Sequence, residues 1–283
     1  MKKILKWLLI IFIIIFLTVI YARYIGTLGF DTKEYTILEK DIPEGFDGIK
    51  IVHFSDLHYN RAINITKVEK IVDEINLINP DIVVFTGDLI DRDVTLSEKD
   101  LNKLTNILLK IKAKYGKYAI MGNHDIDYDM NKVIDIYNGS NFKYLDNEYD
   151  IVYNKKNEKI FIGGLNSVTH NKDDISKMMS YFTDNKENMY KIILVHEPDI
   201  SDKIVNDYSV NLILAGHSHN GQVRFPIIGP IYTPPYSKKY YDNYYNLDGT
   251  NLYISSGLGV STANYRLWNR PSINFYRINK ETS

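Results

Sequence analysis

Five short apolar runs in this chain each end abruptly in a polar cluster that contains Asp, Asn or His. The runs are rich in Ile, Val and Phe, which is typical of buried strands. Between them, apolar residues recur every three or four positions, which predicts amphipathic helices. Strands that alternate with helices indicate an α/β domain built from βαβ-like units. The clusters are Asp56-Leu57-His58, Gly87-Asp88, Gly122-Asn123-His124-Asp125, His196-Glu197-Pro198 and Gly216-His217-Ser218-His219.

The same pattern extends over most of the chain and predicts eight strands and four helices. The strands are apolar without interruption, which indicates burial on both faces. We find no internal repeat or linker that would split the domain. The predicted strands cover 49–54, 82–86, 118–121, 160–163, 192–196, 212–215, 252–255 and 273–278, and the helices cover 68–78, 101–111, 131–137 and 175–182. A short extended stretch at 35–39 precedes them.

The composition is that of a folded protein without sulfur ligands. Of 283 residues, 45% are hydrophobic and 24% charged, which excludes disorder, and the length fits one domain or two small ones. There is no cysteine, so disulfides, thiolate metal sites and a cysteine nucleophile are excluded. The net charge of -1 argues against non-specific nucleic-acid binding. No obligate protein partner is indicated.

The N-terminal segment 4–22 is almost entirely apolar. Its length is close to the ~20 residues that a helix needs to cross a bilayer. A cleaved signal peptide and a buried core helix are the alternatives, although a signal peptide needs small residues at its cleavage site and 20–24 has no such motif. Lys2, Lys3 and Lys6 favour a cytoplasmic N-terminus with the rest of the chain outside, whereas Arg23 and Lys33 oppose this orientation.

The sequence is therefore expected to divide into three parts. Residues 1–24 form a transmembrane anchor, 25–48 a tether with a leading strand, and 49–283 the globular domain. Such a single-pass protein would be located in the membrane, with its domain on the extracytoplasmic side.

The polar clusters contain the residue types of a metal site. Five of the seven histidines lie in them, while His53 sits inside an apolar strand as a core residue and His170 lies in a polar loop, solvated or lining a cleft. Ligands of open α/β sheets collect at the carboxyl ends of the strands, so five such ends can converge on one point. Imidazoles, carboxylates and an amide oxygen suit Mn, Fe or Zn.

Taken together, the motifs resemble those of the calcineurin-like metallophosphoesterase superfamily, whose pattern is D-x-H, G-D-x-x-D-R, G-N-H-[DE], H and G-H-x-H. Every position of that pattern is filled here, within residues 49–278. The resemblance implies a four-layer α/β/β/α sandwich of two mixed sheets, with two divalent metal ions at the strand ends. It also implies a dinuclear phosphoester hydrolase in which a metal-bound hydroxide attacks phosphorus.

The resemblance assigns a role to each matching residue. His124 would stabilise or protonate the leaving oxygen, and Asp125 would orient it and favour the imidazolium form. Arg92 would contact the phosphate, or instead pair with Asp91 or Asp93. The implied ligands are Asp56, His58, Asp88 and His219 for one metal and Asp88, Asn123, His196 and His217 for the other, with Asp88 bridging.

The stretch 216–226 and the segment 232–235 resemble a membrane-associated branch that includes UDP-2,3-diacylglucosamine hydrolases and similar lipid phosphodiesterases. Members of that branch carry a second Gly where Asn220 stands. The segment 232–245 contains six tyrosines with Lys238 and Lys239, which favours contact with lipid headgroups, or else packing over the domain or along its cleft.

These features favour a phosphodiesterase or pyrophosphatase that acts on a lipid-linked or cell-envelope substrate in lipid metabolism. A nucleotide phosphodiesterase of broad specificity and a phosphomonoesterase are the alternative enzymes. A metal-dependent binding module is the non-enzymatic alternative, and His124 separates the two classes, because a module that only binds metal does not need it.

Overall fold

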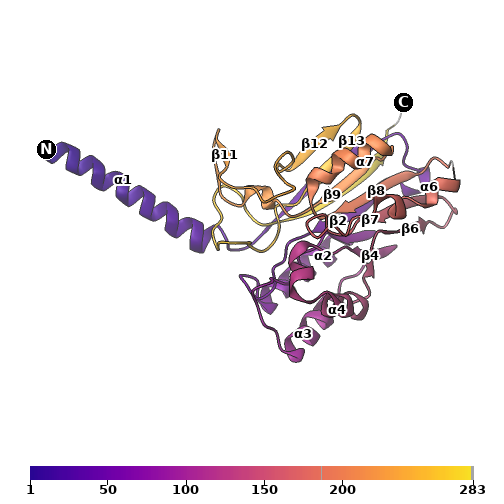
Figure 1. Cartoon of the computed structure of the whole chain (residues 1–283), viewed down its shortest axis with the longest axis horizontal. Helices are drawn as coiled ribbons and strands as arrows, with labels where there is room; N and C mark the ends of the chain where they lie inside the picture. The colour runs from indigo at the N-terminus through magenta and orange to yellow at the C-terminus, as the bar shows by residue number, and fades with distance from the viewer. Residues whose placement is uncertain (186, 282–283) are drawn as a thin grey trace.

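Two six-stranded sheets lie face to face at the centre of the domain, and helices cover their outer faces (Figure 1). The computed structural model describes residues 1–185 and 187–281. The layers follow the order helix, sheet, sheet, helix. The predicted four-layer α/β/β/α sandwich of two mixed sheets is confirmed.

The first sheet has the strand order β1-β14-β2-β3-β4-β5. From β2 to β5 neighbouring strands run parallel, while β14 runs antiparallel to β2 and parallel to β1. The carboxyl ends of β2, β3, β4 and β5 therefore lie at the same edge of the sheet. The bounds are β1 (Asp31–Glu39), β2 (Ile49–Phe54), β3 (Ile82–Phe85), β4 (Gly116–Ala119), β5 (Lys143–Tyr144) and β14 (Ser272–Lys280).

The second sheet has the strand order β12-β13-β9-β8-β7-β6. Its four central strands run parallel, and the two edge strands are antiparallel to their neighbours. The bounds are β6 (Glu148–Tyr153), β7 (Lys159–Gly164), β8 (Tyr190–Val195), β9 (Leu212–Ala215), β12 (Tyr244–Leu247) and β13 (Thr250–Ile254). A small hairpin of β10 (Arg224–Phe225) and β11 (Gly229–Pro230) stands outside both sheets.

The helices divide between the two outer faces. Val68 of α2, Leu104 of α3 and Val133 of α4 pack on the first sheet, and Met178 and Ile204 pack on the second. Side chains from both sheets, such as Val84 and Leu214, fill the layer between them without exposure. The helices are α2 (Ile65–Ile78), α3 (Glu98–Leu108), α4 (Asn123–Gly139), α5 (Ile175–Met178), α6 (Tyr181–Asp184) and α7 (Ser201–Asp207).

The eight predicted strands are all present, with ends that differ by at most a few residues. The main difference is at α4, which is kinked at Asp129: the predicted helix at 131–137 lies after the kink, and a further helical part that begins at Asn123 precedes it. Its first turn carries Asn123, His124 and Asp125, whose polar side chains give no helical apolar spacing. The predicted helix at 175–182 consists of the two short helices α5 and α6. Five strands and one helix were not predicted, because their apolar runs are too short. They are β5, β6, β10, β11, β12 and α7.

The N-terminal helix α1 (Lys2–Ile20) continues into the helical turn η1 (Tyr21–Ile25) and projects from one end of the domain (Figure 1). Together they are long and apolar enough to cross a membrane, and none of that window is buried in the protein. At the base of this helix, the backbone N–H of Arg266 donates to the carbonyl of Ala22, at 2.9 Å. The strand β1 then joins the first sheet directly.

Candidate metal centre

The five polar clusters meet at one place, where β2, β3 and β4 of the first sheet end beside β8 and β9 of the second. The Nε2 atoms of His58 and His219 lie 3.2 Å apart across the two sheets. His196 Nε2 lies 3.3 Å from Asp88 Oδ2, again with one residue from each sheet. The expected convergence of these loops is therefore observed.

The polar side chains form three groups in which the metal-binding atoms lie within 4.8 Å of one another. Every member of the three groups is buried. The first group holds three of the four ligands implied for one metal, without Asp88, and the second holds three of the four implied for the other, without Asn123. The groups are Asp56, His58 and His219; Asp88, His196 and His217; and His58, Asp91 and His124.

Asp88 lies between the first two groups. Its Oδ2 is 3.3 Å from His196 Nε2 and 3.6 Å from His58 Nε2. Burial opposes ionisation of Asp88, but His196 and His124 hold the pKa of its carboxyl well below its usual range. Burial likewise disfavours a charged His196, yet the adjacent Asp88 raises the pKa of this imidazole. The cluster thus favours positive charge next to the Asp88 carboxylate.

Five of the seven expected ligands have a left-handed backbone. Only a few per cent of residues other than Gly adopt this conformation, Asn, Asp and His more often than the rest, and it persists where the surrounding structure enforces it. Such outliers concentrate at functional sites, and here they turn the side chains at the strand ends toward one another. The residues and their φ angles are Asp56 (51°), His58 (43°), Asp88 (59°), His217 (64°) and His219 (47°).

Two glycines allow the loops to approach closely enough. A Cβ on Gly216 would lie 2.2 Å from Ser55 Oγ and 2.7 Å from Asp56 Oδ2. A Cβ on Gly122 would lie 2.2 Å from Asp88 Oδ1 and 2.6 Å from His196 Cε1. The glycine in each motif is therefore required because a ligand side chain occupies the space of its missing Cβ.

The donor set fits divalent metal ions. Asn123 Oδ1 is buried and has no hydrogen-bond partner among the described residues. Buried polar atoms are normally paired, so an unpaired acceptor beside a carboxylate indicates a ligand. Burial, with His58 and Arg266, lowers the pKa of His219 well below its usual range, which keeps this imidazole neutral as a metal ligand must be.

The sequence model of calcineurin-like phosphoesterases matches residues 49–221 of the chain. These residues contain all five clusters. The chain belongs to the calcineurin-like phosphoesterase family. It is a metal-dependent phosphoester hydrolase of that family, with a fold and a donor set that agree.

Individual family members resemble the chain over most of its length. An uncharacterized metallophosphoesterase of Bacillus subtilis, YkuE, is 36% identical over 91% of this chain and 88% of its own. A Danio rerio transmembrane protein with metallophosphoesterase domain is 25% identical over 82% of the chain, which spans 53% of the fish protein. The structure of the Thermus thermophilus sulfate thiohydrolase SoxB matches at 10% identity with a TM-score of 0.50, over 84% of this chain and 58% of SoxB, and shows the fold alone.

Asp125, the last residue of the phosphoesterase motif G-N-H-D, lies elsewhere than expected. Its carboxylate accepts hydrogen bonds from the backbone amides of Asp88, Leu89, Ile90 and Gly122, at 2.7–3.2 Å. No bond joins it to the His124 ring in the described residues. Asp125 thus fixes the loop that carries Asp88, because four backbone amides are better partners for a buried carboxylate than one ring.

The ring of His124 contacts Asp91 and Arg92 rather than Asp125. Its Nδ1 lies 3.6 Å from Asp91 Oδ2 and accepts a hydrogen bond from the Arg92 backbone N–H at 3.3 Å. Burial lowers the pKa of His124 to about 4, so the expected imidazolium is not favoured and the ring is neutral at pH 7. A neutral ring still has one N–H to donate.

Arg92 pairs with neither Asp91 nor Asp93. Its Nη1 lies 2.7 Å from Asp127 Oδ2, and its Nη2 lies 2.8 Å from His124 Nε2. Arg61 pairs with both acids instead: its Nη1 lies 3.1 Å from Asp91 Oδ1 and 3.2 Å from Asp93 Oδ2. Arg92 therefore stands beside His124 at the edge of the site, where it can reach a bound phosphate.

Two acidic residues in or next to the motifs support the ligands. Asp91 Oδ2 lies 3.3 Å from His58 Nδ1, which leaves His58 Nε2 facing the cluster. Such a carboxylate beyond a ligating histidine sets its tautomer and orientation. Glu197, next to His196, accepts from Ser167 Oγ and from the backbone amides of Val168 and Thr169 and so holds the loop after β7. Neither supporting contact is predicted by the sequence.

A sixth strand end, that of β13, also contributes to the site and was not predicted to do so. The loop after β13 contains Gly257 and Gly259, and the Gly259 N–H donates to the Asp56 carbonyl at 2.7 Å. The same signal of glycines after an apolar strand could have found it. The fully buried Arg266 donates to the carbonyls of this loop and lies 3.3 Å from His219 Nδ1. No sequence signal marks Arg266, because it follows neither a strand nor a motif.

Part of the tyrosine-rich segment 232–245 packs over the domain. The Pro235 carbonyl lies 2.9 Å from His217 Nε2, and the amide of Asn220 donates to the Tyr241 carbonyl. Asp199 accepts from the backbone amides of Lys238, Lys239 and Tyr240, which pins the segment beside α7. The segment therefore packs on the domain only in part: Tyr240 is buried and Tyr241 and Tyr245 are half-buried, whereas the other three tyrosines, Tyr232, Tyr236 and Tyr244, are exposed.

Both histidines outside the clusters are also accounted for. His53 is buried and bonded to Thr86 Oγ1 at 2.8 Å, as expected of a core histidine. His170 is half-buried, 3.3 Å from the Asp127 carboxylate that also pairs with Arg92.

The Gly216→Ala variant is expected to bind divalent metal about 10–100-fold more weakly, because the added Cβ displaces Asp56. Metal content after equilibrium dialysis measures this loss. Gly249→Ala is the control, since nothing lies within 4 Å of its position and its φ of +99° adds only local strain. Equal metal content in both variants would contradict the role given to Gly216.

Proposed function

We propose that the chain hydrolyses phosphodiester or pyrophosphate bonds of lipid-linked or cell-envelope substrates, with two divalent ions of Mn, Fe or Zn. The observation that carries the proposal is the position of Asp88 between two groups of buried ligand atoms. One carboxylate with imidazoles on both sides suits a pair of ions that share it.

The two ions would have separate ligands apart from Asp88. Asn123 completes the second set, because its unpaired Oδ1 is buried next to His124, whose backbone N–H bonds to Asp88 Oδ1 at 2.8 Å. When bound, such ions acidify a water molecule and neutralise charge on the phosphate. The proposed ligands are Asp56, His58, Asp88 and His219 for the first ion and Asp88, Asn123, His196 and His217 for the second.

The side chains at the rim would act on the substrate directly. His124 is neutral, and because Nδ1 accepts from the Arg92 backbone, its one N–H is at Nε2, 2.8 Å from Arg92 Nη2. We assign this N–H a hydrogen bond to the leaving oxygen, made when the Arg92 guanidinium turns to the phosphate, rather than the delivery of a proton. On the other side of that ring, Asp91 Oδ2 lies 3.6 Å from His124 Nδ1. Arg92 would bind a non-bridging phosphate oxygen through its guanidinium group, which suits phosphate geometry. Asp125 would contribute by holding the Asp88 loop.

Membrane attachment is supported by the apolar helix α1 and by the name of the Danio rerio relative. The three lysines in the first turns of α1 favour a cytoplasmic N-terminus, which leaves the phosphoesterase domain outside the cell membrane. A domain held at the bilayer in this way meets lipid-linked substrates at high local concentration. This is the reason to prefer them over free nucleotides or phosphomonoesters.

A screen of phosphoesters with Mn, Fe or Zn tests the substrate class. We expect turnover of lipid-linked or sugar-nucleotide diesters and pyrophosphates, and of bis-p-nitrophenyl phosphate, by the full chain in detergent. Turnover of monoesters or free nucleotides alone would overturn the proposed class. If the metal-loaded protein turned over none of the compounds, a metal-dependent binding module would replace the hydrolase.

His124→Ala is expected to retain its metal and to lose roughly 100- to 1,000-fold in kcat on bis-p-nitrophenyl phosphate, the usual effect of removing one hydrogen-bond donor to developing negative charge. His124→Asn, which keeps a neutral donor, should recover part of the rate. Metal content and thermal unfolding are measured in parallel. An unchanged kcat for His124→Ala would refute the role of this ring.

The orientation in the membrane can be tested with single cysteines, since the chain contains none. Lys156→Cys lies in an exposed turn of the domain and should react with a membrane-impermeant maleimide in intact cells. Lys3→Cys should react only after the membrane is permeabilised. The reverse pattern would place the domain in the cytoplasm, and reaction of neither or both sites before permeabilisation would also contradict the proposed orientation.

A further inference from the structure

The hairpin of β10 and β11 and the neighbouring loop expose an unusual number of large apolar side chains. We call these five residues the hairpin patch, and they are Ile227, Ile228, Ile231, Tyr232 and Trp268, with exposed fractions of 108, 80, 65, 60 and 60%. Ile227 and Trp268 line one shallow groove of about 320 Å³, and the Phe225 and Trp268 rings lie 5.4 Å apart. Apolar side chains gathered in this way mark a contact surface.

The tip of the hairpin has a backbone that an isoleucine does not favour. Ile227 has a φ of +73°, a conformation that β-branched residues adopt only at a cost. Gly or Asn would relieve this strain at a fully exposed position. An isoleucine there has no packing partner within the protein, so its apolar side chain points to a contact outside it.

The hairpin patch is fixed beside the end of the apolar helix. The Arg266 backbone bonds to Ala22, and Arg23 Nη1 donates to the Asn264 carbonyl at 3.2 Å, two residues before Arg266. Trp268 lies two residues after Arg266. Figure 1 shows the hairpin standing at the edge of the domain from which α1 projects. Where α1 enters a bilayer, the hairpin patch is therefore held at its surface.

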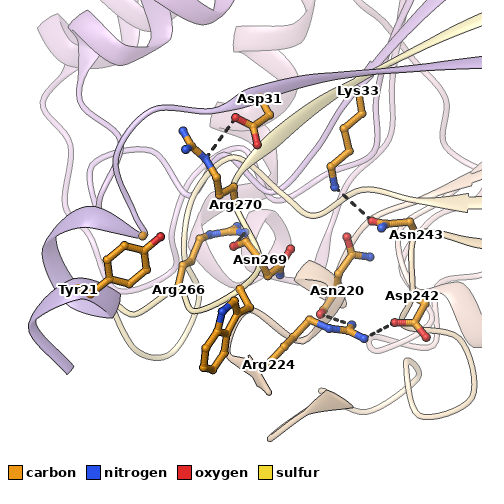
Figure 2. A pocket seen from close by; sticks show the side chains of 12 residues that line it. Tyr21, Asp31, Lys33, Asn220, Arg224, Asp242, Asn243, Arg266, Asn269 and Arg270 are labelled. Carbon is orange, nitrogen blue, oxygen red and sulfur yellow. Dashed lines mark hydrogen bonds and ion pairs between the residues drawn. The ribbon is translucent and has the colours of Figure 1, made fainter. Parts of the chain in front are cut away.

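A basic pocket lies between the anchor and the hairpin patch, with a volume of about 480 Å³ (Figure 2). Tyr21 of the anchor and Trp268 both line it. Arg224 pairs with Asp242 and Arg270 with Asp31, which leaves the positive charges of Lys33 and Arg266 in excess in the pocket. The charged side chains are Lys33, Arg224, Arg266, Arg270, Asp31 and Asp242.

We propose that the hairpin patch is a second membrane contact, inserted at the boundary between headgroups and acyl chains, with the phosphate of an anionic phospholipid at the basic pocket. Aromatic and aliphatic side chains beside cations are typical of surfaces that lie in this interface. The inference rests on the proposed anchoring by α1. It gives the domain one fixed orientation, whereas a single helix would leave it free to swivel.

The two tryptophans of the chain allow the two contacts to be measured separately. Trp7 lies in α1 and Trp268 in the hairpin patch. The full-length Trp7→Phe variant is reconstituted in vesicles of phosphatidylcholine and phosphatidylglycerol that carry bromine near the headgroup end of the acyl chains. Trp268 emission should then be quenched by the lipid and shielded from aqueous iodide. Emission that iodide quenches and the brominated lipid does not would overturn the proposal.

The full-length Trp268→Phe variant reports the anchor through Trp7 in the same vesicles. Quenching of Trp7 without quenching of Trp268 would leave the anchor intact and reject the second contact. Absence of quenching at Trp7 would reject the anchoring itself.

Aspartate at the hairpin tip tests which residues make the contact. Ile227→Asp with Ile228→Asp, in the Trp7→Phe background, should abolish lipid quenching of Trp268. Leu77→Asp is the matched control, because Leu77 is as exposed as Ile228 but lies on α2, and it should change nothing. Vesicles of phosphatidylcholine alone should weaken the quenching several-fold. Equal quenching without the anionic lipid would reject the phosphate at the basic pocket.

Discussion

Everything at the centre of this protein depends on the burial of the Asp88 carboxylate between imidazoles that come from both sheets. A charge with 2% exposure is very unfavourable unless cations and hydrogen-bond donors surround it. Here His58 and His196 face one of its oxygens, and the backbone of His124 donates to the other. The sandwich supplies this arrangement by ending its parallel strands at one edge.

That arrangement requires an unfavourable backbone conformation at the strand ends. Ligands with left-handed φ angles and glycines without room for a Cβ occur together at the strand ends, and the packed sheets on both sides keep these loops from relaxing. Asp125 shows the same principle, because its carboxylate is used to hold three amides of the Asp88 loop and the amide of Gly122. The motif residues thus include groups that build the site as well as groups that would act in it.

One buried arginine connects the ligand cluster with the base of the apolar helix. The Arg266 side chain holds the loop after β13 and lies next to His219, while its backbone bonds to the end of the apolar helix. In the proposed membrane attachment, these short contacts rather than a long linker would set the distance between bilayer and ligands. A fixed distance would suit the proposed lipid-linked substrate.

The sequence by itself determined the alternation of strands and helices, the polar clusters that end the strands and the apolar N-terminal helix, because each is a local pattern of spacing and residue type. It could not place Asp125 on backbone amides or Arg92 beside His124, since both depend on where other loops lie. Nor could it reveal Arg266, whose partners are far away along the chain. Only the packing of the two sheets decided these contacts, because it brings together loops separated by more than 100 residues.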